Sequence, residues 1–273
     1  MISAPPPALP VPTELTQQVD VGGRRLAMTC SGAGPLTVLL ETGLGAEADE
    51  WAVVQGEVAR VARVCRYDRA SRGKSDPAPK PRNAAQMVDD LDTLLRLTHT
   101  AGPYIVVGHS YGGLLMRLFA ARHRSDVKGL VLVDSLQAEQ FNVFSEGFPP
   151  PSPGEPPALA GIRAFWTGGW RSPASTVEGI DMPTSLDQDR AVGSLGDLRI
   201  RVIHADTFLH NEAAPAAFRP MLQAKWNDLQ RRFAALSTRV TFRHAAASSH
   251  FVQRDDPGLV AEVINDLVAE VAD

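Results

Sequence analysis

The chain has 273 residues, of which 44% are hydrophobic and 21% charged, values typical of a globular protein with a sizeable core. Its formal net charge of -4 and pI near 6.0 exclude the strongly basic surface of a nucleic-acid binder, so we expect no nucleic-acid partner. No segment reaches the roughly 20 apolar residues that span a bilayer. The proline-rich residues 1–13 lack a basic region followed by an apolar run and predict an extended arm. We therefore expect a cytoplasmic protein without a membrane span, and the sequence leaves its oligomeric state open.

Short β-branched runs alternate with helical patterns along most of the chain. Strands are predicted over 24–30, 36–42, 63–69, 104–110, 127–135, 198–205 and 239–246, with a hairpin turn, Val-Gly-Gly, before the first. Helices are predicted over 50–60, 83–99, 114–123, 215–236 and 256–271. This alternation indicates an α/β fold with a mostly parallel sheet flanked by helices.

Residues 136–197 interrupt the alternation and show no clear strand. This segment contains the proline-rich run FPPPSPGEPP and the aromatic residues Phe141, Phe144, Phe148, Phe165, Trp166 and Trp170. An irregular insertion in a regular α/β array is typical of a lid over the functional edge of the sheet. We predict a core domain of 14–135 and 198–273 with a lid of 136–197, whose aromatic rings either line an apolar pocket or pack the lid onto the core.

Cys30 and Cys65 are the two cysteines of the chain. They could pair if their strands are neighbours, but two cysteines do not make a disulfide framework, and we expect reduced thiols in the core. There is no Cys-x-x-Cys motif for metal or redox chemistry, so we expect no metal and no cofactor.

The sequence Gly108-His109-Ser110-Tyr111-Gly112 follows an apolar strand and precedes a helix. A sharp turn at that point forces its middle residue into a strained conformation, and glycines on both sides allow strand and helix to approach closely. The serine hydroxyl is then exposed at the helix N-terminus, where unpaired N–H groups favour negative charge. Ser110 is therefore predicted to be a nucleophile.

A serine nucleophile needs a base, and the base needs a carboxylate to fix its tautomer. Of the seven histidines, His250 lies on the loop between the last predicted strand and the last helix, at the sheet edge where Ser110 emerges. Asp134 and Asp206 both follow predicted strands and both keep the chain order serine, acid, histidine. We favour Asp134 because it ends a strongly apolar strand, and Asp206 stays open as the alternative.

A tetrahedral intermediate at Ser110 would need two donors for its oxyanion. One is the backbone N–H of Tyr111, directly after the nucleophile. The other is expected from the loop after the strand over 36–42, where Gly43-Leu44-Gly45 leaves the backbone open, and we choose the Leu44 N–H.

With these motifs, residues 24–271 resemble the α/β-hydrolase fold superfamily, in its serine hydrolase and esterase branch with a lid after the sixth strand. The resemblance rests on LETGLGAEADEW, RVCRYDRASRGKSDP, GPYIVVGHSYGG, VKGLVLVDS and SSHFVQRDDP. It implies an eight-stranded sheet. Members often carry the acid after the seventh strand, where this chain has Phe208 at the expected position; others carry it after the sixth, which Asp134 matches. Thr42-Gly43 replaces the usual His-Gly of the oxyanion loop, and Ser71 replaces a glycine.

The resemblance implies a serine hydrolase that cleaves a small, uncharged carboxylic ester through an acyl-enzyme. Dehalogenases and epoxide hydrolases of this fold use a carboxylate at the elbow. The serine at position 110 therefore excludes these two classes of enzyme. Lactone, thioester or amide hydrolysis by the same triad remains open, as does a ligand-binding protein without turnover.

Overall fold

The computed structural model describes residues 13–148, 150–212 and 214–272. They form an eight-stranded sheet with the strand order β1-β2-β4-β3-β5-β6-β7-β8. The strands are β1 (Leu15–Asp20), β2 (Arg25–Ser31), β3 (Thr37–Glu41), β4 (Arg63–Tyr67), β5 (Tyr104–His109), β6 (Val127–Val133), β7 (Arg199–Ala205) and β8 (Arg239–Ala245). β2 pairs antiparallel with β1 and with β4, and all other neighbours are parallel. The predicted mostly parallel, eight-stranded sheet is confirmed; the predicted arm over 1–13 lies outside the described residues except for Thr13.

Apolar side chains alternate between the two faces of the sheet. In β3 all five residues are buried. Val38 and Leu40 pack under α1 (Ala52–Val58) and α9 (Pro257–Ala272), whereas Leu39 faces α2 (Ala84–Leu97) and α3 (Tyr111–Arg122). A strand buried on both faces needs an unbroken apolar run, which is the pattern that predicted these strands.

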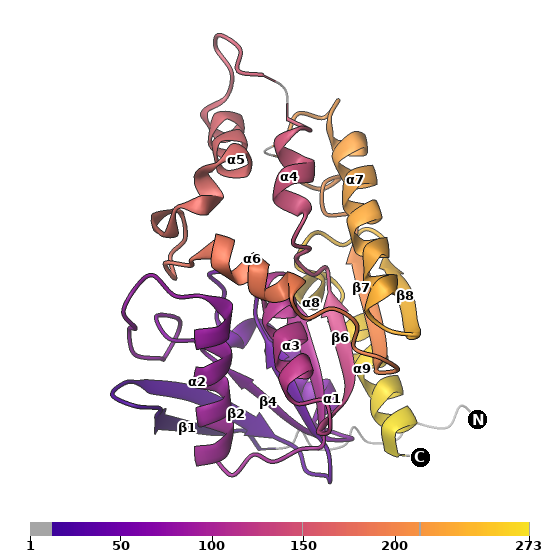
Figure 1. Cartoon of the computed structure of the whole chain (residues 1–273). Helices are drawn as coiled ribbons and strands as arrows, with labels where there is room; N and C mark the ends of the chain where they lie inside the picture. The colour runs from indigo at the N-terminus through magenta and orange to yellow at the C-terminus, as the bar shows by residue number, and fades with distance from the viewer. Residues whose placement is uncertain (1–12, 149, 213, 273) are drawn as a thin grey trace, which may run out of the picture.

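Between β6 and β7 the chain leaves the sheet. In the described residues of 136–197 it forms α4 (Gln140–Ser145), α5 (Pro157–Thr167) and α6 (Met182–Arg190) and no strand of the sheet. Figure 1 shows α4 and α5 at the upper end of the molecule, far from the β1–β2 hairpin. After β7 come α7 (Arg219–Arg231) and, after β8, the short α8 (Val252–Asp255). The division into a core and a lid stays a prediction.

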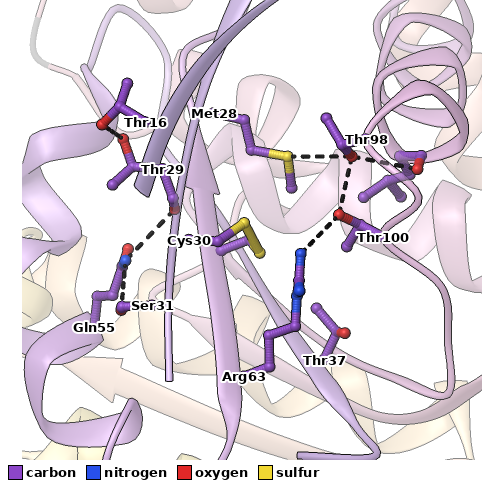
Figure 2. Close-up of a disulfide and its surroundings, with 12 residues drawn as sticks. Thr16, Met28, Thr29, Cys30, Ser31, Thr37, Gln55, Arg63, Thr98 and Thr100 are labelled. Carbon is purple, nitrogen blue, oxygen red and sulfur yellow. Dashed lines mark hydrogen bonds between the residues drawn. A yellow bond between two sulfur atoms is a disulfide. The ribbon is translucent and has the colours of Figure 1, made fainter. Parts of the chain in front are cut away.

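Cys30 and Cys65 form a disulfide, so the expectation of two reduced thiols was wrong. The two residues lie directly opposite each other in the antiparallel pair β2–β4, with a Cα–Cα distance of 4.1 Å (Figure 2). The error has a physical cause: β2 and β4 are 32 or more residues apart in sequence, and the pairing depends on β3 inserting on the far side of β4. Residue patterns predict strands but not their neighbours.

No helix in the described part of the chain is long and apolar enough to cross a membrane. The cytoplasmic location stays a prediction. The disulfide weighs against it, because disulfides persist mainly in oxidising compartments.

Candidate active site

Ser110 lies at the turn between β5 and α3 and has backbone angles φ 52° and ψ -120°. Few residues other than glycine adopt a positive φ, so the serine is held in a strained conformation. A Cβ on Gly108 would lie 2.5 Å from the carbonyl oxygen of Gly112, and one on Gly112 would lie 2.4 Å from that of Thr42. The turn is therefore closed to any larger side chain at these two positions. The helix begins at Tyr111, three residues before its predicted start.

His250 lies between Ser110 and Asp134. Its Nε2 is 2.9 Å from the Ser110 Oγ, and its Nδ1 is 2.6 Å from the Asp134 Oδ2. The three residues come from the loops or turns that follow β5, β6 and β8. The carboxyl ends of these parallel strands meet at one edge of the sheet, and this topology brings together side chains that are up to 140 residues apart.

Asp134 is completely buried, and four hydrogen-bond donors converge on its carboxylate. Oδ1 accepts from the Ala205 N–H at 3.0 Å and from the Trp226 indole N–H at 2.8 Å. Oδ2 accepts from the Thr207 hydroxyl as well as from His250. The sequence analysis missed Trp226 and Thr207, and no motif identifies them: Trp226 is one apolar position on α7, and Thr207 one residue of a loop.

Asp206, the alternative acid, faces away from this chain of hydrogen bonds. Its Oδ1 is 2.8 Å from the His244 Nε2, and its Oδ2 accepts from the Ala247 N–H at 3.4 Å. It makes no hydrogen bond with His250 among the described contacts. The structure thus brings together Ser110, His250 and Asp134, and places Asp206 in a separate pair.

His109 is hydrogen-bonded to the backbone of the loop that carries His250. Its Nε2–H donates to the His250 carbonyl at 2.7 Å, and the Gln253 side-chain amide donates to its Nδ1 at 3.2 Å. Burial and, next, the adjacent His250 hold the pKa of His109 well below the usual range for histidine. These two hydrogen bonds fit the neutral tautomer of His109, which donates from Nε2 and accepts at Nδ1.

A cavity of about 660 Å³ opens beside Ser110, and Leu44 and Tyr111 line it with the serine. As the first residue of α3, Tyr111 has a backbone N–H without a partner inside the helix. The two residues predicted to supply oxyanion donors therefore border the space in front of the hydroxyl. Their role as donors stays a prediction.

Aromatic side chains form much of the cavity wall. All six aromatic residues singled out in the insertion pack in hydrophobic clusters, and three of them, Phe141, Phe165 and Trp166, also line the cavity. Both predictions for these rings therefore hold for the three residues that line the cavity. The loop after β7 adds Thr207, Phe208, His210, Asn211 and Glu212 to the wall.

A family model described as the alpha/beta hydrolase fold matches residues 37–190. The chain belongs to the α/β-hydrolase fold family. The uncharacterized protein YqjL of Bacillus subtilis is 25% identical to this α/β-hydrolase over 240 residues, which cover 86% of this chain and 85% of that protein.

Solved structures agree on the fold and differ in chemistry. A loop variant of the haloalkane dehalogenase DbeA from Bradyrhizobium elkanii superimposes with a TM-score of 0.68 at 15% identity, covering 95% of this chain and 98% of that one. The serine hydrolase CarC, involved in carbazole degradation, gives a TM-score of 0.61 at 17% identity, covering 94% and 99%. At such identities the likeness shows the fold alone, and the fold supports a hydrolase.

Proposed function

We propose that this α/β-hydrolase cleaves small, uncharged carboxylic esters with Ser110 as nucleophile, His250 as base and Asp134 as the triad carboxylate that orients His250. The observation that carries the proposal is the continuous hydrogen-bond chain from the Ser110 Oγ through His250 to Asp134. Its Ser110 end faces a cavity with largely apolar walls. A nucleophile, a base and a group that orients the base are the parts that acyl transfer requires.

The hydrogen bonds define the order of proton movements. Asp134 accepts a hydrogen bond from the Nδ1–H of His250, which leaves the Nε2 lone pair facing Ser110. Nε2 therefore takes the hydroxyl proton as Oγ attacks the ester carbonyl. The oxyanion forms against the N–H groups of Leu44 and Tyr111. His250 then protonates the leaving alcohol, and water hydrolyses the acyl-enzyme by the same steps in the second half-reaction.

The nucleophile separates this chemistry from that of the dehalogenase with the same fold. Attack by Ser110 on an alkyl halide or an epoxide would leave an ether on the serine, which water does not hydrolyse. Attack on an ester leaves an acyl group, whose carbonyl water can attack again. A serine at this position thus supports acyl transfer and disfavours turnover of alkyl substrates.

The walls of the cavity support an uncharged substrate. Among the described residues that line the cavity, Glu212 is the one carboxylate and is exposed, and most of the others are aromatic or aliphatic. A charged substrate group bound away from Glu212 would lose hydration without gaining an ion-pair partner. We further propose that residues 136–197 act as a lid, because Phe141, Phe165 and Trp166 from this segment line the cavity beside Ser110.

The test is a series of p-nitrophenyl esters of increasing acyl length, assayed with the wild type and Ser110→Ala. We expect turnover by the wild type and none above background for the variant, with both proteins unfolding at the same temperature. A fluorophosphonate probe should label Ser110 in a peptide map. Ligand binding without turnover would instead support a binding protein, and turnover retained by Ser110→Ala would refute the mechanism.

A further inference from the structure

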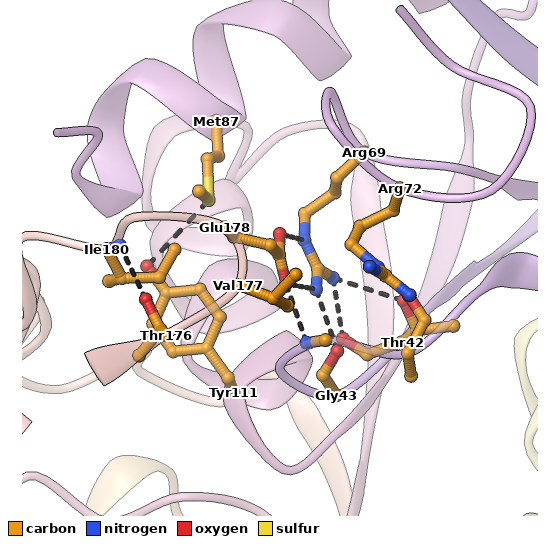
Figure 3. Close-up of polar contacts among 12 residues, drawn as sticks. Thr42, Gly43, Arg69, Arg72, Met87, Tyr111, Thr176, Val177, Glu178 and Ile180 are labelled. Atoms are coloured by element: carbon orange, nitrogen blue, oxygen red, sulfur yellow. Dashed lines mark hydrogen bonds and ion pairs between the residues drawn. The ribbon is translucent and has the colours of Figure 1, made fainter. Parts of the chain in front are cut away.

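Arg69 is a buried cation next to the candidate site that the proposed mechanism does not use. Its side chain is 2% exposed, and all its donors are satisfied. Nε and Nη2 donate to Glu178 at 2.8 and 2.7 Å, and Nη1 donates to Glu41. The same guanidinium also binds two backbone carbonyls, those of Thr42 at 2.7 Å and Gly43 at 2.7 Å (Figure 3).

These two carbonyls belong to the loop that carries Leu44. In a trans peptide the C=O and the following N–H point in opposite directions. The Gly43–Leu44 peptide is trans, and its carbonyl points at Arg69, so the Leu44 N–H points away from the guanidinium. That N–H has no hydrogen-bond partner among the described residues, and Leu44 borders the cavity beside Ser110.

Glu178 ties the far side of the same loop to the insertion. Its Oε1 accepts from the Gly45 N–H at 2.7 Å and from Arg69. The peptides before and after Leu44 are therefore both fixed by one ion pair between the core and residue 178 of the insertion, as Figure 3 shows for Arg69, Gly43 and Glu178.

The two carboxylates around Arg69 are not equivalent. Burial raises the pKa of Glu41 despite the nearby Arg69, whereas in Glu178 the effect of burial is outweighed by the charge and hydrogen bonds of Arg69, and its pKa is lowered. Arg69 therefore favours the ionised form of Glu178 more strongly than burial opposes it. Buried ion pairs contribute little net stability compared with apolar packing, so their presence is better explained by the geometry that they impose.

We propose that Arg69 is a positioning residue that, braced by Glu178, aims the Leu44 N–H at the oxyanion formed on Ser110. The inference rests on the proposed function, since it assigns a task within the same site. A cation on the Gly43 carbonyl also polarises the peptide, which makes the Leu44 N–H a stronger donor. The insertion thereby takes part in forming the oxyanion hole, through Glu178.

The test compares Arg69→Lys with a matched control, Arg82→Lys. Lysine keeps the charge at position 69 but cannot bind both carbonyls and both carboxylates with its single nitrogen. Arg82 is also buried, and its side chain donates to Asp90 at 2.6 Å and to the Gln86 carbonyl at 3.0 Å; among the described residues it makes no hydrogen bond to the loop. For Arg69→Lys we expect kcat on a p-nitrophenyl ester to fall roughly 10- to 100-fold, less than or near the loss of one oxyanion donor. KM should stay within about threefold, because ground-state binding is untouched.

Inhibitor affinity separates positioning from general damage. An alkyl trifluoromethyl ketone forms an anionic hemiketal on a serine, whereas the matching methyl ketone binds as a ground-state ligand. In Arg69→Lys the Ki of the former should rise by the same factor by which kcat falls, and that of the latter should not change. Arg82→Lys should lower the unfolding temperature without changing either Ki or kcat.

Equal effects of the two lysine variants on kcat, or an unchanged trifluoromethyl ketone affinity in Arg69→Lys, would overturn the proposal. If Arg69→Lys does not fold, Glu178→Gln carries the test, with a smaller parallel change in kcat and in trifluoromethyl ketone Ki expected. If the wild type hydrolyses no ester, the proposed function fails. The trifluoromethyl ketone Ki still decides the role of Arg69, because hemiketal formation needs no leaving group: His250 takes the Ser110 proton, and the anion forms against the oxyanion donors.

Discussion

The substitution Asp134→Asn tests the proposed triad through the hydrogen bonds that Asp134 accepts. The carboxylate accepts on both oxygens, whereas a carboxamide has one oxygen and one NH2 group. The Ala205 N–H and the Trp226 indole N–H both donate to Oδ1, so the Asn oxygen should occupy that position. The NH2 group then faces His250 Nδ1, while the Thr207 hydroxyl can rotate to accept from it. His250 is forced into the tautomer with a proton on Nε2, which cannot accept the proton of Ser110.

We expect kcat to fall by roughly 10³- to 10⁴-fold, the loss known for an amide in place of a triad carboxylate. This corresponds to about 4–5.5 kcal/mol of activation free energy. The assay is steady-state hydrolysis of a p-nitrophenyl ester, with Asp206→Asn as the matched control. Asp206 binds His244 and the loop backbone, so its amide variant should keep kcat within about threefold of the wild type. A larger loss in Asp206→Asn than in Asp134→Asn would refute the assignment of the acid.

Three further predictions concern stability and the cavity. The pKa of His109 is held well below its ordinary value by burial and by the adjacent His250. As the pH drops below the ordinary histidine pKa of about 6.5, His109 therefore binds a proton in the unfolded chain but not in the folded one. This residue should lower the free energy of unfolding by about 1.4 kcal/mol for each pH unit of acidification in that range. Urea titrations at several pH values should show a smaller slope for His109→Gln. Replacing both Cys30 and Cys65 by serine should lower the free energy of unfolding by about 3–4 kcal/mol, since the disulfide closes a loop of 35 residues. Equal urea midpoints for the variant and the wild type, together with two titratable thiols in the wild type without reductant, would contradict this. Phe165→Ala should lower kcat/KM for esters with long acyl chains by about tenfold and kcat/KM for acetate esters little. Trp170 stacks on Phe141 and does not itself line the cavity, so Trp170→Ala should lower the unfolding temperature without this dependence on chain length.

Sequence patterns predicted the layers of this fold well because the strands beneath the helices are buried on both faces. An unbroken apolar run such as that of β3 or β6 has few other places in a folded chain. The same patterns could not reveal that Cys30 faces Cys65, because the order of strands in a sheet depends on tertiary packing and not on local periodicity. The helices of the insertion were also missed, since short helices such as α4 carry little periodic signal.

The site divides in the same way. Ser110 and His250 were predicted from the elbow motif and from the position of their loops at one sheet edge, and the structure places their side chains within hydrogen-bond distance. The sequence favoured Asp134 because of the apolar strand that it ends, but it left Asp206 open, because both residues follow strands and the direction of each side chain depends on tertiary packing. Arg69 lies in one of the segments that carry the family resemblance, RVCRYDRASRGKSDP, but nothing in the sequence marks it as buried. Its position against the backbone of another loop depends on contacts with residues 26 or more positions away.

The position of the proposed triad acid, Asp134, after β6 has a consequence for the evolution of substrate specificity in this α/β-hydrolase. In relatives with the acid after the seventh strand, that loop must preserve a triad member. Here the loop after β7 contributes Phe208, His210, Asn211 and Glu212 to the cavity wall and no proposed triad residue. On the proposed mechanism, mutations in these four residues would retune substrate choice while leaving the reaction machinery intact, so a library randomised over 208 and 210–212 is the natural starting point for directed evolution of new specificities.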